Sequence, residues 1–231
     1  MKNPLTITLL TIGLVSPALA DDVLINYQFH AGSAIATSSA IGIDASEFDI
    51  GPAGADGSPA WIISGGTEMA LGYANSTPAS EADAVTNGSY FGFTLTPDEG
   101  NEVSLTTLTF DTIANATQGL SGSANVTFFV RSSVDNYATT IDSFNQEYVN
   151  SFTFDQVDNR TVTLSGASYQ DLTEATTFRI YIWDTSGSSL RTPRIDNVIL
   201  NGTAAIPEPS SAVLPALALL GVLVYRRRRL K

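Results

Sequence analysis

The stretch TFRIYIWD, Thr177 to Asp184, alternates between two kinds of side chain. Its apolar residues Phe178, Ile180 and Ile182 share one face of an extended chain, and the residues between them, Trp183 among them, share the other face. Successive side chains of a strand point to opposite sides, so this alternation predicts a strand with one face buried in a core and the other turned outward.

Similar short segments recur along the chain, separated by clusters of Gly, Asn, Asp and Pro, so we expect about ten strands. Ala60 to Ser64 and Glu68 to Tyr73 flank Gly65-Gly66, which predicts a hairpin. On composition, Gly51 to Pro59 and Thr77 to Gly88 are expected to be loops. The further expected strands are Val23 to Phe29, Ser89 to Thr96, Glu102 to Ile113, Ala124 to Ser132, Val149 to Asp155, Thr161 to Leu164 and Arg194 to Asn201. This pattern predicts an all-β fold, an antiparallel β-sandwich of the jelly-roll type.

The segment Glu102 to Ile113 (EVSLTTLTFDTI) changes phase within one expected strand. Val103 and Leu105 lie on one face by alternation, whereas Leu108 and Phe110 fall in the opposite phase. A single extra residue at Thr106-Thr107 would return both pairs to the same face. The sequence therefore predicts a β-bulge there, or a strand that changes face where a sandwich bends.

Residues 1–20 have the features of a secretory signal peptide: Lys2, an apolar run from Leu5 to Val15, and an A-x-A pattern that ends at Ala20. We expect a signal helix that is cleaved after Ala20; the alternative is an uncut N-terminal anchor. The β-sandwich domain then covers residues 21–203, and residues 204–231 form a separate C-terminal segment.

Charge is unevenly distributed in the chain. Between Asp21 and Ile206 there are five arginines, no lysine and 22 acidic residues, a formal net charge of −17. Such a domain repels nucleic acid, so no nucleic-acid partner is expected. The chain has no cysteine, which removes thiol catalysis and thiolate metal sites.

The C-terminal segment holds a short apolar run, residues 210–225, followed by Arg226, Arg227, Arg228 and Arg229. As a helix the run spans only about 24 Å, short of the ~30 Å hydrocarbon core. It is nevertheless apolar all round and ends in a basic block, which favours a transmembrane helix with its C-terminus in the cytoplasm over a buried amphipathic helix. The basic tail is residues 226–231.

Immediately before this run stands Ile206-Pro207-Glu208-Pro209-Ser210. The order of this motif (206–210), a short apolar helix and a terminal arginine cluster resembles the PEP-CTERM sorting signal, with Ile206 in place of the usual Val. The resemblance covers only residues 206–231. It implies processing at Pro207, Glu208 and Pro209 by an exosortase, an inner-membrane intermediate held by the C-terminal helix, and final location at the cell surface or in the extracellular matrix. The alternative is a plain single-pass anchor in which these prolines form a rigid linker.

Segments of the body, Phe91 to Leu95 and Arg194 to Val198 among them, are similar to parts of the ectodomains of such proteins, which resemble carbohydrate-binding jelly rolls. This looser resemblance makes exposed aromatic rings, Trp183 and Tyr137, candidates for stacking on glycans. It also makes Asp196 and Asn197 candidate ligands of a structural Ca²⁺, because hard oxygen ligands suit that ion. No other cofactor is expected.

No catalytic residues are predicted. His30 is the only histidine, no Gly-x-Ser-x-Gly motif is present, and no pair among the many carboxylates stands out. We expect a secreted surface or matrix protein, not an enzyme, with a structural or adhesive role alongside exopolysaccharide. A carbohydrate-binding module with a defined ligand and a glycan-active enzyme remain the alternatives.

Overall fold

A computed structural model describes residues 22–29, 33–52, 60–64, 68–72, 78–116, 125–148, 157–184 and 191–205. The expected signal peptide, the expected strand Val149 to Asp155 and the whole segment 206–231 lie outside these residues. Among the residues that are described, no helix has the length and apolar character needed to cross a membrane.

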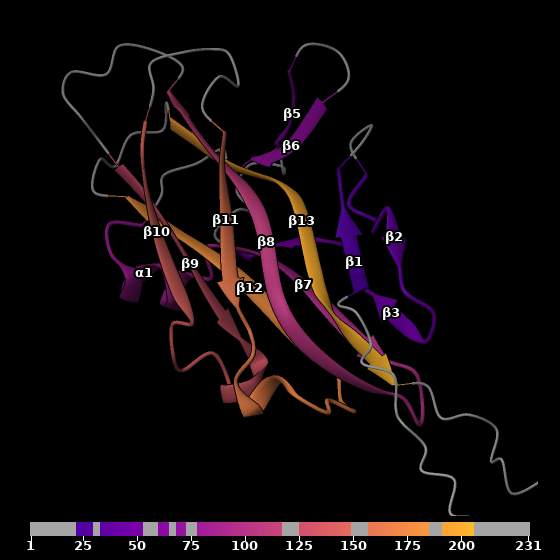
Figure 1. The fold of residues 1–231 in the computed structure, drawn as a ribbon. Helices are drawn as coiled ribbons and strands as arrows, with labels where there is room; N and C mark the ends of the chain where they lie inside the picture. The colour runs from indigo at the N-terminus through magenta and orange to yellow at the C-terminus, as the bar shows by residue number, and fades with distance from the viewer. Residues whose placement is uncertain are drawn as a thin grey trace, which may run out of the picture.

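The described chain forms two antiparallel sheets, shown in Figure 1. Sheet A contains, in spatial order, β11 (Val157–Thr163), β8 (Glu102–Ala116), β13 (Arg191–Ala205), β1 (Asp22–Tyr27) and β2 (Ser38–Ser39), and a hairpin of β5 (Ala60–Ser64) and β6 (Glu68–Gly72) that joins it through β13. Sheet B contains β10 (Asp142–Glu147), β9 (Asn125–Ser132), β12 (Thr176–Asp184), β7 (Tyr90–Pro97) and β3 (Ile43–Ala45), and β4 (Asp49–Ile50) also pairs with β7. The prediction of an antiparallel β-sandwich is thus confirmed.

The order of the main strands is that of a jelly roll. In sheet A the strand order is β11-β8-β13-β1, so the first strand, β1, pairs with the last strand, β13. In sheet B the order is β10-β9-β12-β7. Strands β2 to β6 are inserted between β1 and β7. Asp22, at the start of β1, pairs with Gly202 near the end of β13, so both ends of the domain leave from the same end of sheet A.

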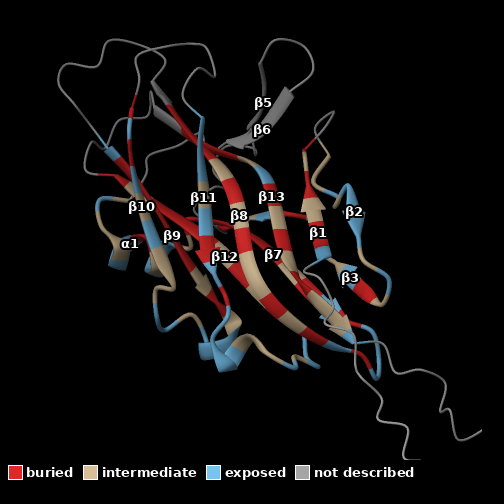
Figure 2. Cartoon of the chain, in the orientation of Figure 1, coloured by how far each residue is buried: buried red, intermediate tan, exposed pale blue. Residues whose placement is uncertain are grey.

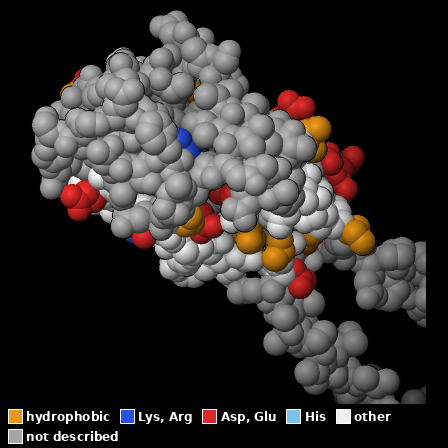
Figure 3. Space-filling view, turned by 90° about the horizontal axis from the view of Figure 1, so that it is seen from above, with side chains coloured by type: hydrophobic (Ala, Val, Ile, Leu, Met, Phe, Trp, Pro, Cys, Tyr) orange, Lys and Arg blue, Asp and Glu red, His pale blue; other side chains and the backbone are white. Residues whose placement is uncertain are grey.

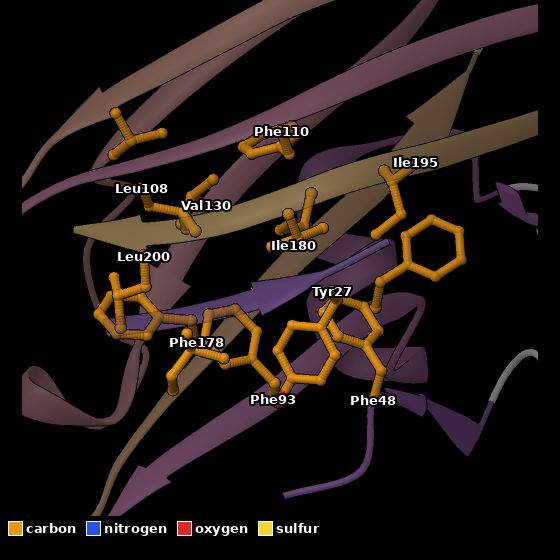
Figure 4. Close-up of a cluster of buried hydrophobic side chains, with 14 of the residues drawn as sticks. Tyr27, Phe48, Phe93, Leu108, Phe110, Val130, Phe178, Ile180, Ile195 and Leu200 are labelled. Carbon is orange, nitrogen blue, oxygen red and sulfur yellow. The ribbon is translucent and has the colours of Figure 1, made fainter. Parts of the chain in front are cut away.

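A row of aromatic rings fills much of the space between the sheets, as Figure 4 shows. The ring centroids lie 4.9 Å apart for Tyr27 and Phe48, 5.5 Å for Phe48 and Phe93, and 5.7 Å for Phe93 and Phe178. The Tyr27 hydroxyl donates a hydrogen bond to the Ser46 carbonyl at 2.6 Å, and burial raises the pKa of this phenol. The row joins β1 of sheet A to β7 and β12 of sheet B, and such ring pairs add to the stabilisation from buried area.

The phase change in Glu102 to Ile113 is a β-bulge in β8, as predicted. Asn201 of β13 pairs with Thr107, whereas the next residue, Gly202, pairs with Leu105, so Thr106 is the extra residue. Val103, Leu105, Leu108 and Phe110 are all buried, and Figure 2 shows buried and half-buried residues alternating along β8 and β13. The bulge keeps one face of a 15-residue strand on the core.

One expected loop is in part a helix. Within Thr77 to Gly88, residues Glu81–Asn87 form α1, which the Ser80 hydroxyl caps by accepting a hydrogen bond from the Asp83 N–H at 3.1 Å. Gly88 ends the helix in the left-handed conformation at φ 69°. Composition missed the helix because it spans only seven residues and is stabilised by the packing of Ala84 against sheet B.

Four strands were also missed. β2, β3 and β4 have only two or three residues each, too few to show alternation. β10 (DSFNQE) is polar and is the terminal strand of sheet B, where among the described strands it pairs only with β9.

The close approach of β13 to the bulge requires glycine at position 202. A Cβ atom there would overlap the Ser104 carbonyl oxygen and lie 3.0 Å from the Leu105 Cα, both backbone atoms that cannot rotate away. We therefore expect Gly202→Ala to lower the free energy of unfolding by about 1–3 kcal/mol, measured by urea denaturation. Gly166→Ala is the control, because its Cβ would meet no atom within 4 Å and its φ of −66° suits alanine. Equal stability of the two variants would contradict this account of the bulge.

Candidate functional site

The outer face of sheet B carries a hollow of about 240 Å³. β12 contributes Arg179 and Thr177, β7 contributes Tyr90 and Gly92, β4 contributes Asp49, and the turn after β9 contributes Tyr137. We call this site the Arg179 hollow; its principal lining residues are Asp49, Tyr90, Gly92, Tyr137, Thr177 and Arg179.

The Arg179 guanidinium lies between two aromatic rings. Its central carbon is 3.9 Å from the ring centroid of Tyr137 and 4.3 Å from that of Tyr90, well within the range of cation–π attraction. Burial alone would lower the pKa of Arg179, but the hydrogen bond with Tyr181 and the surrounding tyrosines raise it above its ordinary value. The group is therefore a positive charge in cation–π contact with two rings.

Gly92 makes room for this arrangement. It is the partner of Arg179 in the β7–β12 ladder, and a Cβ atom on Gly92 would come within 3.2 Å of the Tyr90 ring and 3.1 Å of the Phe178 carbonyl oxygen. The missing side chain lets the Tyr90 ring lean over the strand and leaves the floor of the hollow open. Beside it, the hydroxyls of Thr94 and Thr177 form a hydrogen bond of 2.8 Å.

A strained turn brings Tyr137 to the hollow. After β9 the chain makes one turn of 3₁₀-helix, Ser133–Asp135, and then Asn136 and Tyr137 both adopt left-handed conformations at φ 61° and 60°. Asparagine tolerates this region, but a bulky residue such as tyrosine rarely adopts it. Strain of this kind persists where surrounding contacts enforce it, and it is concentrated at functional sites.

Arg131 supplies the enforcing contacts. Its Nη1 donates to the Tyr137 carbonyl at 2.8 Å, and its Nη2 forms an ion pair of 2.7 Å with Glu81 of α1. The Thr140 hydroxyl donates to the same Glu81 oxygen at 2.6 Å. The hydrogen bonds from Thr140 and Arg131 lower the pKa of Glu81 below its ordinary value. One side chain thus links the Tyr137 turn to the helix.

Of the residues predicted to stack on glycans, the structure places only Tyr137 in the hollow. Trp183 lies on the same outward face of β12 as Arg179, as the alternation predicted, but it is half-buried and packs with Val85 against the cluster of Ala84, Tyr90, Phe129 and Tyr181. Helix α1 lies over this end of the strand. The stacking role of Trp183 stays a prediction.

The residues predicted to bind calcium lie on sheet A, away from the hollow. The Asn197 side-chain amide donates to the Asp111 carboxylate at 2.8 Å, and the Asn197 backbone N–H donates to the Asp196 carboxylate at 2.7 Å. Asp111, the acid that accepts the Asn197 hydrogen bond, belongs to β8. Within the described ranges, no three acidic or histidine side chains form a group suited to a metal ion, and the calcium site stays a prediction.

Sequence analysis missed Arg179, Tyr90, Gly92 and Asp49 as site residues. A signal for Arg179 was present, because the outward face of TFRIYIWD carries an arginine and two aromatic residues where a solvent-facing strand usually carries small polar ones. No signal in the sequence could join it to Asp49 or Tyr137, because strand pairing and a turn bring these residues together.

The acidic side chains of the domain are not gathered in one place. Figure 3 shows them at several separate positions on the face seen from above. The described part of the chain has two ion pairs, Arg131 with Glu81 and Arg160 with Asp158. Arg179 has no ion pair with any described carboxylate.

Comparison with known proteins finds similarity only to solved structures. The chain is similar to the tandem CBM22-1–CBM22-2 domain of Xyn10C from Paenibacillus barcinonensis, at 15% identity and a TM-score of 0.37 over 85% of this chain and 49% of that one. It is also similar to the K3 cleaved adhesin domain of Lys-gingipain from Porphyromonas gingivalis, at 15% identity and a TM-score of 0.37 over 78% of this chain and 99% of that one. A third match is the arabinose-bound α-L-arabinofuranosidase MgGH51, at 13% identity and a TM-score of 0.36 over 78% and 27% of the two chains.

The chain thus spans about half of the tandem CBM22-1–CBM22-2 domain. These identities and TM-scores are too low to assign the chain to the class of any of these proteins. No family model matches the sequence, and no curated protein matches it either.

The Glu81–Arg131 ion pair, which links α1 to the Tyr137 turn, is expected to make the free energy of unfolding depend on pH. Because the pKa of Glu81 is lowered on folding, its ionised form stabilises the fold above the ordinary value of 4.5, and this contribution is lost as the pH falls through the lower folded value. We expect Glu81→Gln to lower the free energy of unfolding at pH 7 by no more than about 1 kcal/mol, because Glu81 is partly exposed. The difference from the natural protein should shrink at pH 3.

Urea denaturation at both pH values measures this effect. Glu99→Gln is the control, since Glu99 is exposed and its side chain bonds to no described residue; it should change stability at neither pH. A loss of stability with Glu81→Gln that is the same at pH 3 as at pH 7 would show that the lost contact is not electrostatic.

Proposed function

We propose that this domain is a saccharide-binding module of an exported protein, and that the Arg179 hollow is its binding site. The observation that carries the proposal is the pair of tyrosine rings, Tyr90 and Tyr137, held beside an open floor at Gly92 on the outer face of a sheet.

The chemistry of the hollow suits a sugar. Aromatic faces pack against the C–H groups of a pyranose ring, while charged and hydroxyl groups bond its hydroxyls. Arg179 and Asp49 supply a donor and an acceptor at the same site, and the Thr94 and Thr177 hydroxyls lie beside them. A volume of about 240 Å³ is below the roughly 300 Å³ at which pockets begin to enclose drug-sized ligands. The hollow therefore fits one ring of a longer polysaccharide.

Binding of this kind gives the expected adhesive role a mechanism. A protein at the cell surface or in the extracellular matrix that holds single sugar residues weakly gains strength when many copies contact one polymer. The proposed function is thus the carbohydrate-binding module that the sequence analysis kept as an alternative. Such a module is compatible with a structural or adhesive role alongside exopolysaccharide. No reaction is assigned to the hollow.

We further propose that residues 206–231 act as the PEP-CTERM signal that they resemble, with an exosortase as the processing partner. The last residue of β13 is Ala205, so Pro207-Glu208-Pro209 follows the folded domain almost at once. Two prolines keep this segment out of a helix, which suits an extended peptide in a protease groove.

Removing the Tyr137 ring tests the binding proposal. We expect Tyr137→Ala to weaken binding to the best polysaccharide on a glycan array at least about fivefold, because a stacking surface is lost. Tyr137→Phe is the matched control, since it keeps the ring and the cation–π contact and should keep most of the affinity. If the array shows no ligand, or if the alanine variant binds as well as the natural protein, the hollow is not the site.

Mass spectrometry of the mature protein from its native host tests the sorting proposal. We expect a C-terminus at or near Pro207-Glu208-Pro209, with residues 210–231 removed. A mature protein that still carries Arg226 to Lys231 would support the plain membrane anchor instead. As a control, replacing Pro207, Glu208 and Pro209 by alanine should leave the tail attached.

A further inference from the structure

Arg179 is a positive charge in an acid-rich domain, and it forms no ion pair with any carboxylate of the described residues. The segment 21–206 has 22 acidic residues for five arginines, so acids to pair with Arg179 were available in excess. Asp49 lines the same hollow but forms no ion pair with Arg179, and it is not among the groups that shift the pKa of that residue.

The neighbouring strand adds positive charge to the same place. In the β9–β12 ladder Arg131 lies directly opposite Arg179, and like charges in this position repel each other. Glu81 forms the ion pair with Arg131 and also accepts the Thr140 hydrogen bond, so it neutralises only one of the two guanidinium groups. Among the described residues, Arg179 therefore has no ion-pair partner, although the Asp49 carboxylate lines the same hollow.

The contacts of Arg179 stabilise its charge but leave hydrogen-bond donors free. Tyr90 and Tyr137 both make cation–π contacts with the guanidinium, and neither contact uses its N–H donors. Its one hydrogen bond to a described residue is a long contact of 3.4 Å from Nη1 to the Tyr181 hydroxyl. The Nε–H is shielded from water and has no acceptor among the described residues. A carboxylate bound in the hollow would therefore accept hydrogen bonds from the Nη groups rather than from Nε.

From these observations we infer that the saccharide bound in the Arg179 hollow is acidic, and that Arg179 binds the carboxylate of a uronic acid residue while Tyr137 packs on its ring. The inference rests on the proposed function and adds the class of ligand. A neutral sugar would leave the guanidinium without an ion-pair partner, because the Asp49 carboxylate lines the hollow but forms no ion pair with Arg179.

The net charge of the domain opposes a polyanion only at long range. At 0.15 M salt the Debye length is about 8 Å, so acidic groups elsewhere on the surface are largely screened, whereas a direct contact with Arg179 is not. A single uronate held at the edge of a longer, partly neutral polymer therefore suits this site better than a continuous run of charges.

The test compares acidic sugars with their uncharged esters. The ligands are oligomers of galacturonate, glucuronate and mannuronate, each as the free acid and as the full methyl ester. Each ligand is titrated by calorimetry into the exported protein at 0.15 M NaCl. We expect at least one acid to bind about tenfold more tightly than its ester. Arg179→Gln should remove that preference, so that the acid and its ester bind with similar affinity, because a charge-assisted hydrogen bond to the carboxylate is lost.

Arg160→Gln is the matched control for charge. Arg160 also stacks on a ring, 5.5 Å from the Phe144 centroid, but it belongs to β11 in the other sheet and has its own ion pair with Asp158. This variant should keep the preference for the acid. Tyr137→Ala should weaken acid and ester alike.

The outcomes separate the two proposals. If acids and esters bind equally, or if Arg179→Gln keeps the preference for the acid, the inference about the ligand is overturned and saccharide binding stands. If neither acids, nor esters, nor any glycan on the array binds, the proposed function itself fails. Circular dichroism of each variant shows whether a loss of binding follows from unfolding; in that case Arg179→Lys, which keeps the charge but not the planar fork, replaces Arg179→Gln and should show a reduced preference.

Discussion

The burial of one face of β12 is the constraint on which the rest of the structure depends. Phe178, Ile180 and Ile182 lie wholly inside the sandwich, at the centre of a sheet in which β12 pairs with β9 on one side and β7 on the other. A slip of one residue would exchange the two faces of the strand and place Arg179 in the core. The cost of burying an unpaired charge excludes that register, so the same apolar residues that form the core also direct the functional side chains outward.

The outer face of sheet B is only partly covered, and this partial cover defines the site. Helix α1 packs on Tyr181 and leaves the Arg179 end of β12 open. The two ends are not independent, because Arg131 bonds both Glu81 of the helix and the carbonyl of Tyr137. The short helix therefore does more than shield apolar surface: it fixes the turn that supplies one wall of the hollow.

Two rings hold the charge of Arg179 in place without neutralising it. Cation–π contacts with Tyr90 and Tyr137 stabilise a guanidinium by about 0.5–2 kcal/mol each and do not occupy its N–H donors. An ion pair would occupy those donors. In a domain with so many acidic residues, this choice of partner distinguishes Arg179 from Arg131 and Arg160, whose charges are balanced within the fold.

Alternation alone determined the fold class, most of the long strands and the bulge in β8, because a period of two and its interruption at Thr106 are local properties of the chain. Alternation did not predict the short edge strands or α1, because their stability comes from neighbours distant in sequence. For the site, the sequence identified Tyr137 and the outward face that carries Trp183. It also contains the motif Pro207-Glu208-Pro209, whose proposed sorting role does not depend on the fold. Only the tertiary structure decided that helix α1 covers Trp183, that Tyr137 reaches the face of Arg179, and that Glu81 pairs with the neighbouring arginine. These are contacts between strands, a helix and a turn separated by about 40 to 100 residues in the chain, and such contacts are set by strand register and packing rather than by any local pattern.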